Sequence, residues 1–232
     1  MKGARELSDD EVIILVHSFS GKYAVRNRAL FILGCCSGAR ISELLSLNVK
    51  DVWQFGRVVD AVYFERRNTK GKKEGRSIPL VSDAQAAITE LIQWLKQEGF
   101  STEKNAPAFP SQKGGRLKRR QALQVIEDAK NVAKLTGKVT SHSCRKTFAH
   151  RVFRNSGNLY TVKEALGHRS ISTTEQYLSI SEEELRDAIP DFGISQKSHV
   201  FIHCYGGRLP LLSPVFPPPL TQPLNLNVHS GL

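Results

Sequence analysis

The chain has 232 residues, a formal net charge of +11 and a sequence pI near 9.7. A chain of this length can bury a substantial core, and a hydrophobic fraction of 40% is typical of a folded protein. The excess of Lys and Arg predicts a polyanionic partner, because clustered cations release counterions when they meet phosphates. The sequence shows no apolar run that could cross a bilayer and no secretory signal at its start, so a membrane surface is the less favoured partner.

The four cysteines do not indicate a metal site. Cys35 and Cys36 are adjacent, Cys144 and Cys204 stand alone, and no CxxC pair exists. Neighbouring cysteines do not bridge easily to each other, so a disulfide framework is also unsupported. We therefore expect reduced thiols, a reducing compartment and no bound metal.

Helix signals dominate residues 1–192. Capping-box patterns at Ser8–Glu11 and Ser82–Gln85 mark two helix starts, because each serine can accept from the first turn and each Glu or Gln can reach back. Apolar runs, further capping pairs and terminal glycines predict the other helices. The expected helices lie at about 8–16, 26–36, 41–45, 82–96, 118–135, 142–155, 161–166, 170–178 and 181–189.

A β-hairpin is expected between the third and fourth of these helices. Residues 58–64 are rich in β-branched and aromatic side chains, which is typical of a strand. A polar, glycine-containing connection at 68–75 leads to a return strand at 77–80. The sequence thus predicts a mainly α protein with a small antiparallel β-sheet, an α+β fold.

Residues 193–232 differ from the rest of the chain. They contain no Asp or Glu, hold most of the prolines and show no periodicity, which predicts a disordered or extended tail. Without Lys197 and Arg208 of this tail, residues 1–192 still carry about +9. We therefore expect one folded, basic domain over 1–192 and a proline-rich tail after it.

Two clusters of basic residues stand out, one on the expected hairpin and one at a loop-to-helix junction. Each could be a solvated surface, but contact with phosphates is favoured on a chain this basic. The hairpin cluster comprises Arg66, Arg67, Lys70, Lys72, Lys73 and Arg76, and the junction cluster comprises Lys113, Arg116, Lys118, Arg119 and Arg120.

Two short motifs place arginines where an anion could bind. Arg40 follows a glycine-led turn at a helix start, where backbone N–H groups favour anions. Glu43, one turn on, could orient Arg40 or cap the helix. His142 and Arg145 are three positions apart and share a helix face, and the planar guanidinium suits phosphate oxygens. We expect neither arginine to be a core residue.

A third motif combines a histidine with a tyrosine. His168 follows the expected helix stop at Gly167, and Tyr177 lies nine positions further along. Taken alone, a half-buried structural tyrosine is the ordinary interpretation, and a histidine with an arginine on a surface helix is common.

Together these motifs resemble one family in order, spacing and residue type. GARISELLSL resembles the first arginine box of the tyrosine recombinases, also called the phage integrase family; HSCRKTFAH resembles the second box and LGHRSISTTEQYL the last. NTKGKKEGRSIPL resembles the hairpin that carries the family lysine. The boxes extend over about residues 8–190, and the mainly helical catalytic domain of that family agrees with the elements above.

The resemblance implies a covalent mechanism for DNA cleavage and rejoining. Tyr177 would attack phosphorus and form a 3′-phosphotyrosyl link. Arg40 and Arg145 would clamp the nonbridging oxygens, with His168 as a third donor. His142 would act as a general base or a positioning group. Neither a metal, nor another cofactor, nor ATP is required.

The general acid would be a lysine of the hairpin. Lys70 is favoured because it precedes the turn glycine, as the family lysine often does. The hairpin is one residue longer than in common relatives, so Lys72 and Lys73 remain alternatives.

The implied partner is double-stranded DNA, bound as a homotetramer on paired sites, with a monomer expected for the isolated domain off DNA. Such a protein would be cytoplasmic and associated with the nucleoid. Family members usually carry an N-terminal DNA-clamping domain, so the sequence is either a fragment or a recombinase without that domain. The alternatives are a type IB topoisomerase-like enzyme and a non-catalytic DNA-binding relic of the family. The residues of the boxes favour a recombinase over a topoisomerase. The filled catalytic positions argue against a non-catalytic protein.

Overall fold

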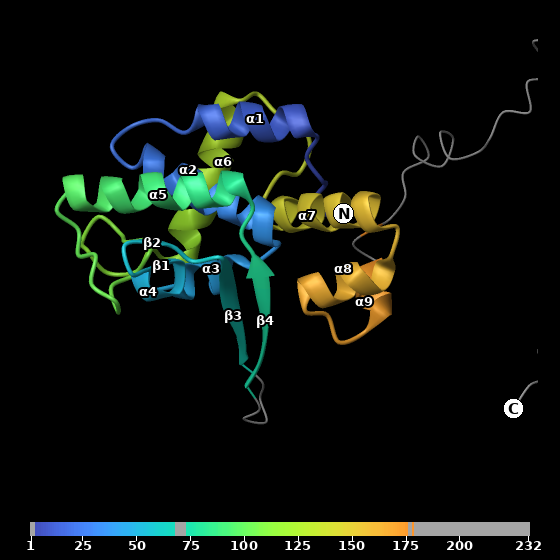
Figure 1. The fold of residues 1–232 in the computed structure, drawn as a ribbon. Helices are drawn as coiled ribbons and strands as arrows, with labels where there is room; N and C mark the ends of the chain where they lie inside the picture. The colour runs from blue at the N-terminus through green and yellow to red at the C-terminus, as the bar shows by residue number, and fades with distance from the viewer. Residues whose placement is uncertain (1–2, 68–72, 176–177, 179–232) are drawn as a thin grey trace, which may run out of the picture. The chain divides into compact units, whose positions relative to one another are not determined.

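The computed structural model describes residues 3–67, 73–175 and 178, which belong to one compact unit, Met1–Ile180 (Figure 1). The helices of this described part are α1 Asp9–Ser18, α2 Ala24–Ser37, α3 Ile41–Ser46, α4 Val49–Val52, α5 Ser82–Gln97, α6 Arg119–Val132, α7 Ser141–Ser156, α8 Leu159–Leu166 and α9 Ile171–Glu175. The strands are β1 Trp53–Gln54, β2 Arg57–Val58, β3 Ala61–Arg67 and β4 Lys73–Pro79. The expected mainly α fold with small antiparallel sheets is confirmed.

Helix α2 lies at the centre of this unit and packs against α5 on one side and α7 on another. Its apolar side chains explain this position, since Leu30 and Leu33 are fully buried and join the main core cluster. The helix ends where Gly38 adopts a left-handed conformation with φ 59° and donates to the Gly34 carbonyl. An added Cβ at Gly38 would lie 2.3 Å from the Phe148 ring, so both the turn and the packing of α7 require glycine.

The hairpin of β3 and β4 is longer than the sequence indicated and shifted along the chain. Strand β3 begins at Ala61 instead of 58, because Arg57–Val58 pairs with Trp53–Gln54 around a separate tight turn. Strand β4 begins at Lys73 instead of 77, because the backbone ladder continues into the basic segment whatever the side chains are. The register places Arg76 opposite Phe64, whose side chain is buried in the core.

Several helix starts were predicted correctly and others were not. The Ser8–Glu11 capping box forms as expected. The one at Ser82–Gln85 was wrong: Val81 is the N-cap residue, and the Gln85 side chain donates to the Leu80 carbonyl. Helix α8 also begins before Thr161, because the Asn158 side chain caps it by accepting from the Tyr160 N–H.

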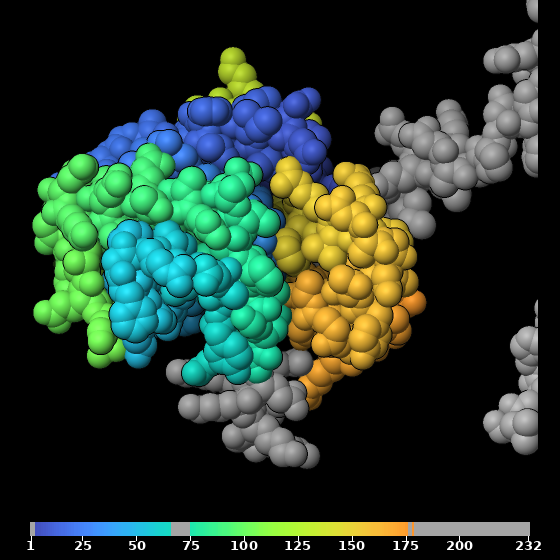
Figure 2. All heavy atoms as spheres, viewed as in Figure 1, coloured from blue at the N-terminus to red at the C-terminus, as the bar shows by residue number. Residues whose placement is uncertain are grey.

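Helix α8, which leads into the third motif at His168, contacts the hairpin. Helix α7 packs against α2 and α8, and α8 in turn contacts β4 and α9. The space-filling view shows the described part of the hairpin beside α8 and α9 (Figure 2). The expected helix at 181–189 and the expected tail at 193–232 lie outside the described residues. Among the described helices, none combines the length and the apolar character needed to cross a membrane.

Candidate active site

Arg145 is a core residue, and this corrects the expectation that neither arginine would be buried. Its side chain extends from α7, and the residue is only 1% exposed. Its guanidinium donates to the Gly38 carbonyl at the end of α2 and, over 2.7 Å, to the Leu166 carbonyl at the end of α8. Carbonyls at helix C-termini are only partly satisfied within the helix and carry partial negative charge. They therefore stabilise a buried cation and fix its orientation.

His168 contacts Arg145 directly. The distance from Arg145 Nη2 to His168 Nε2 is 2.9 Å, and His168 Nδ1 lies 3.0 Å from Thr174 Oγ1. Both His168 and Thr174 are buried. Arginine has donors only, so His168 Nε2 must accept and Nδ1–H must donate to the threonine. This contact pattern corresponds to the tautomer that carries its proton on Nδ1.

Glu43 both orients Arg40 and caps its helix, so the two alternatives for this residue are realised together. Arg40 occupies the N-cap position of α3, and its backbone N–H donates to Glu43 Oε2 over 2.7 Å. Its side-chain Nη1 donates to Glu43 Oε1 over 3.0 Å, while 42% of the side chain stays exposed. The Arg40 guanidinium is therefore held by Glu43 through one nitrogen, and its side chain remains accessible at the surface of the site.

Arg76 is not a surface residue of the hairpin cluster. Its side chain is only 10% exposed and forms an ion pair with Glu43, with Nη2 2.8 Å from Oε2. Burial opposes ionisation of Glu43, but the hydrogen bonds and charges of Arg76 and Arg40 outweigh it and lower the pKa of Glu43 to about 2. Glu43 is therefore ionised at neutral pH and links two arginines.

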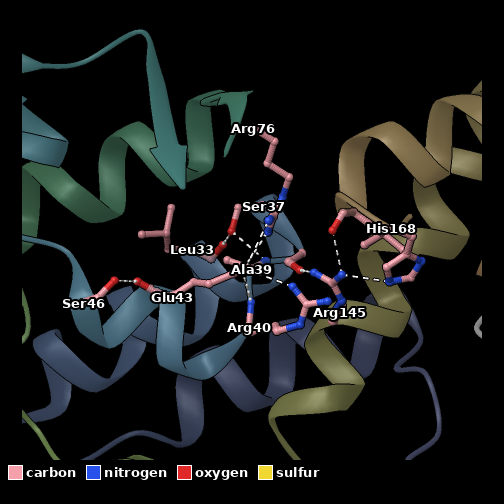
Figure 3. Close-up of polar contacts among 11 residues, drawn as sticks. Leu33, Ser37, Ala39, Arg40, Glu43, Ser46, Arg76, Arg145 and His168 are labelled. Atoms are coloured by element: carbon pink, nitrogen blue, oxygen red, sulfur yellow. Dashed lines mark hydrogen bonds and ion pairs between the residues drawn. The ribbon is translucent and has the colours of Figure 1, made fainter. Parts of the chain in front are cut away.

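His142 lies at the start of α7, where its backbone N–H donates to the Thr140 hydroxyl. Partial burial lowers its pKa, and the charges of Arg145, Arg119 and Arg40 lower it further. Arg145 also donates to the Gly38 carbonyl, two residues before Arg40, so the first and second motifs meet at one electropositive place. Figure 3 shows Arg76 reaching toward the start of α3 from above, and Arg145 lying between Arg40 and His168.

Several predicted site residues lie beyond the part of the chain that the structure describes in full. Lys70, Lys72 and Tyr177 lie outside the described residues, and only the backbone of Arg66, Arg67 and Lys73 is described. The junction cluster is exposed around the start of α6, but Arg116 donates to the carbonyls of Leu45 and Leu47 and so supports the fold. Within the described part of the chain, no group of three His, Cys, Asp or Glu side chains is placed to hold a metal ion.

Sequence reasoning missed two contributors to this site. Thr174 fixes the tautomer of His168, but a threonine six residues after a histidine carries no recognisable signal. Arg76 was grouped with its charged neighbours, although its alternation with the buried Ile78 along one face of β4 indicated an inward side chain.

The chain is similar to known proteins in sequence and in fold. Residues 5–184 match the model of the phage integrase family. The chain is 31% identical over 189 residues to the tyrosine recombinase XerD of Mycobacterium leprae, covering 79% of this chain and 59% of that protein. It is 32% identical over 196 residues to XerC of Halalkalibacterium halodurans, covering 80% and 62%. The chain therefore spans about three-fifths of the length of these relatives.

Solved structures agree with the sequence matches. The XerA recombinase structure has a TM-score of 0.67 at 25% identity, covering 81% of this chain and 64% of that one. The XerH recombinase in a post-cleavage complex with its palindromic difH substrate has a TM-score of 0.66 at 25% identity, covering 84% and 54%. With the family model matching most of its length, the chain belongs to the phage integrase family of tyrosine recombinases.

Proposed function

We propose that this chain is a site-specific recombinase of the integrase type, which cleaves and rejoins double-stranded DNA through a 3′-phosphotyrosyl intermediate. One observation carries the proposal: the Arg145 guanidinium joins the three sequence motifs, because it donates to the Gly38 carbonyl two residues before Arg40 and contacts His168. A relative in this family, XerH, is described in a complex with its DNA substrate after cleavage.

The two arginines would stabilise charge that develops on the nonbridging oxygens of the scissile phosphate. Arg145 is fixed in advance by two helix-end carbonyls, so its charge needs no reorganisation during the reaction. Arg40 is the more exposed of the pair and is available to an incoming phosphate. His142, with its lowered pKa, is suited to accept a proton near neutral pH.

His168 would complete the clamp as a donor only after a change of state. Its Nε2 now accepts from Arg145, and protonation of this nitrogen, with release of that contact, would allow His168 to donate to the phosphate. Tyr177 would be the nucleophile and Lys70 the general acid for the leaving 5′ oxygen, with Lys72 and Lys73 as the alternatives. The covalent link retains the energy of the phosphodiester, so neither ATP nor a metal is needed in this scheme.

The proposed assembly is a tetramer on paired DNA sites and a monomer off DNA. Residues 1–192 would form the catalytic domain and 193–232 a proline-rich tail. The exposed side chains of the junction cluster, Lys113, Lys118, Arg119 and Arg120, would contact backbone phosphates beside the site.

The decisive experiment is capture of the covalent intermediate. Nicked duplexes with randomised recognition arms would be incubated with the protein, and adducts identified by mass spectrometry of the linked peptide. We expect a phosphotyrosine at Tyr177. No adduct with any duplex, together with retained DNA binding, would favour the non-catalytic relic; relaxation of supercoils without two-site exchange would favour the topoisomerase-like alternative.

A further inference from the structure

Arg76 contacts three elements of the active site at once. Its guanidinium pairs with Glu43 at the start of α3, and it lies over the ring of Phe64 on β3, 5.1 Å from the centroid. Its aliphatic part lies against Gly167, where an added Cβ would be 3.2 Å from Arg76 Cδ. Gly167 has φ 65° and directly precedes His168. One side chain therefore joins the turn of Arg40, the turn of His168 and the hairpin.

Glu43 is shared between two arginines, Arg40 and Arg76. Glu43 Oε2 accepts from Arg76 Nη2, and Oε1 accepts from both Arg40 Nη1 at 3.0 Å and Arg76 Nη1 at 3.3 Å. Among the described residues, the Arg40 side chain is held by this one contact with Glu43. Without Arg76, the buried carboxylate would have Arg40 as its remaining cationic partner, and a bidentate pair would compete with the substrate phosphate for the same guanidinium.

We propose that Arg76 is a positioning residue for strand cleavage: it shares Glu43 with Arg40 and so leaves the Arg40 guanidinium free to bind the scissile phosphate. This inference rests on the proposed function and assigns Arg76 a role different from DNA backbone contact. Its contacts support that assignment, because both terminal nitrogens of its guanidinium donate to Glu43.

The test compares Arg76→Met, Arg76→Lys, Glu43→Gln and the double variant Glu43→Gln/Arg76→Met. The matched control is Arg57→Met, which removes an arginine from an exposed ion pair with Asp60 in the β1–β2 sheet, away from the site. Single-turnover cleavage would be measured at saturating nicked duplex, and DNA affinity as a function of salt.

We expect Arg76→Met to lower the cleavage rate constant by about tenfold or more, as when a partner that orients a functional group is lost. Its DNA affinity and salt slope should stay at the wild-type values. The double variant should cleave faster than Arg76→Met, because removal of the carboxylate charge releases Arg40. Arg57→Met should behave as wild type, and Arg76→Lys should fall between wild type and Arg76→Met.

Three results would overturn the inference. One is an unchanged cleavage rate in Arg76→Met. Another is a salt slope reduced by about 0.9, which is the signature of one lost phosphate contact. The third is a cleavage loss that Glu43→Gln fails to relieve and that follows the fall in melting temperature, which would indicate a purely structural role.

A readout without DNA keeps this inference separate from the proposed function. In a carboxyl NMR titration of the protein alone, Arg76→Met should raise the Glu43 pKa and shift the Arg40 Nε–Hε signal, whereas Arg57→Met should change neither. If the wild-type protein forms no adduct but these shifts occur, the proposed function is refuted, whereas the link between Arg76 and Arg40 is supported. If the shifts are absent, the link itself is refuted.

Discussion

Arg145 Nη2 and His168 Nε2 lie 2.9 Å apart in the buried part of the site. Because arginine offers donors only, this contact determines which ring nitrogen of His168 carries the proton. The Nδ1–H group donates a hydrogen bond to the Thr174 hydroxyl, with 3.0 Å between Nδ1 and Oγ1. The three side chains form a continuous series of polar contacts from α7 to α9.

Thr174→Val should lower the cleavage rate because it removes the acceptor for His168 Nδ1–H while keeping the side-chain shape. A buried donor left without its partner also costs about 1–3 kcal/mol of folding free energy. Thr174→Ser is the matched control, since it retains the hydroxyl. Calorimetry and single-turnover cleavage would check both effects; equal behaviour of the valine and serine variants would show that the hydroxyl does not act on His168.

Arg40→Ala and Arg145→Ala should each reduce cleavage by about a hundredfold or more, as for loss of a preorganised charge donor. Their stabilities should differ. Arg145→Ala leaves two helix-end carbonyls without a buried partner, whereas the Arg40 side chain is 42% exposed. Only Arg145→Ala should therefore unfold at clearly lower denaturant concentration. Wild-type cleavage in either variant would remove that arginine from the clamp.

Tyr177→Phe should bind DNA as wild type does and form no covalent adduct, because only the phenolic oxygen is lost. Tyr160→Phe is the natural comparison, since Tyr160 is exposed on α8 and lies beside Lys163. Gel-shift binding and denaturing gels of trapped adducts measure the two properties separately. An adduct at normal yield in Tyr177→Phe would assign the nucleophile to another tyrosine, with Tyr160 and Tyr205 tested next.

Cleavage should depend on pH through His142, if this residue is the base. Its pKa is lowered by partial burial and then by the nearby arginines, so the neutral form persists below the ordinary value of 6.5. The rate constant should therefore be retained as pH falls through 6.5 and decline only at lower pH. Neutralising one contributing charge, in Arg119→Gln, should move this decline to higher pH. A decline that stays in place in His142→Asn belongs to another group.

The identity of the general acid can be tested through the leaving group. Lys70→Ala should slow cleavage more than Lys72→Ala or Lys73→Ala, because a general acid acts at the bond that breaks. When a sulfur replaces the bridging 5′ oxygen, the leaving group departs without protonation. This substrate should therefore rescue only the variant that lacks the general acid. Rescue of Lys72→Ala or Lys73→Ala instead would shift the assignment along the hairpin, and rescue of none would point to His142.

The sequence by itself determined the fold class, most helices and the motif residues of the site. Apolar periodicity and capping residues act within one turn of chain, so the Ser8–Glu11 capping box and the stop of α2 at Gly38 were predictable from neighbouring residues. The spacing of His142 and Arg145 on one helix is equally local. The order of the motifs then identified the family, because three separate boxes rarely match by chance.

The tertiary structure alone decided which charges are buried and what they contact. Arg145 and Arg76 look like ordinary basic residues in the sequence, yet one joins the ends of α2 and α8 and the other shares Glu43 with Arg40. These contacts join residues 107, 21 and 33 positions apart. A local pattern cannot encode them, because the free energy that permits a buried charge depends on partners that only packing brings together.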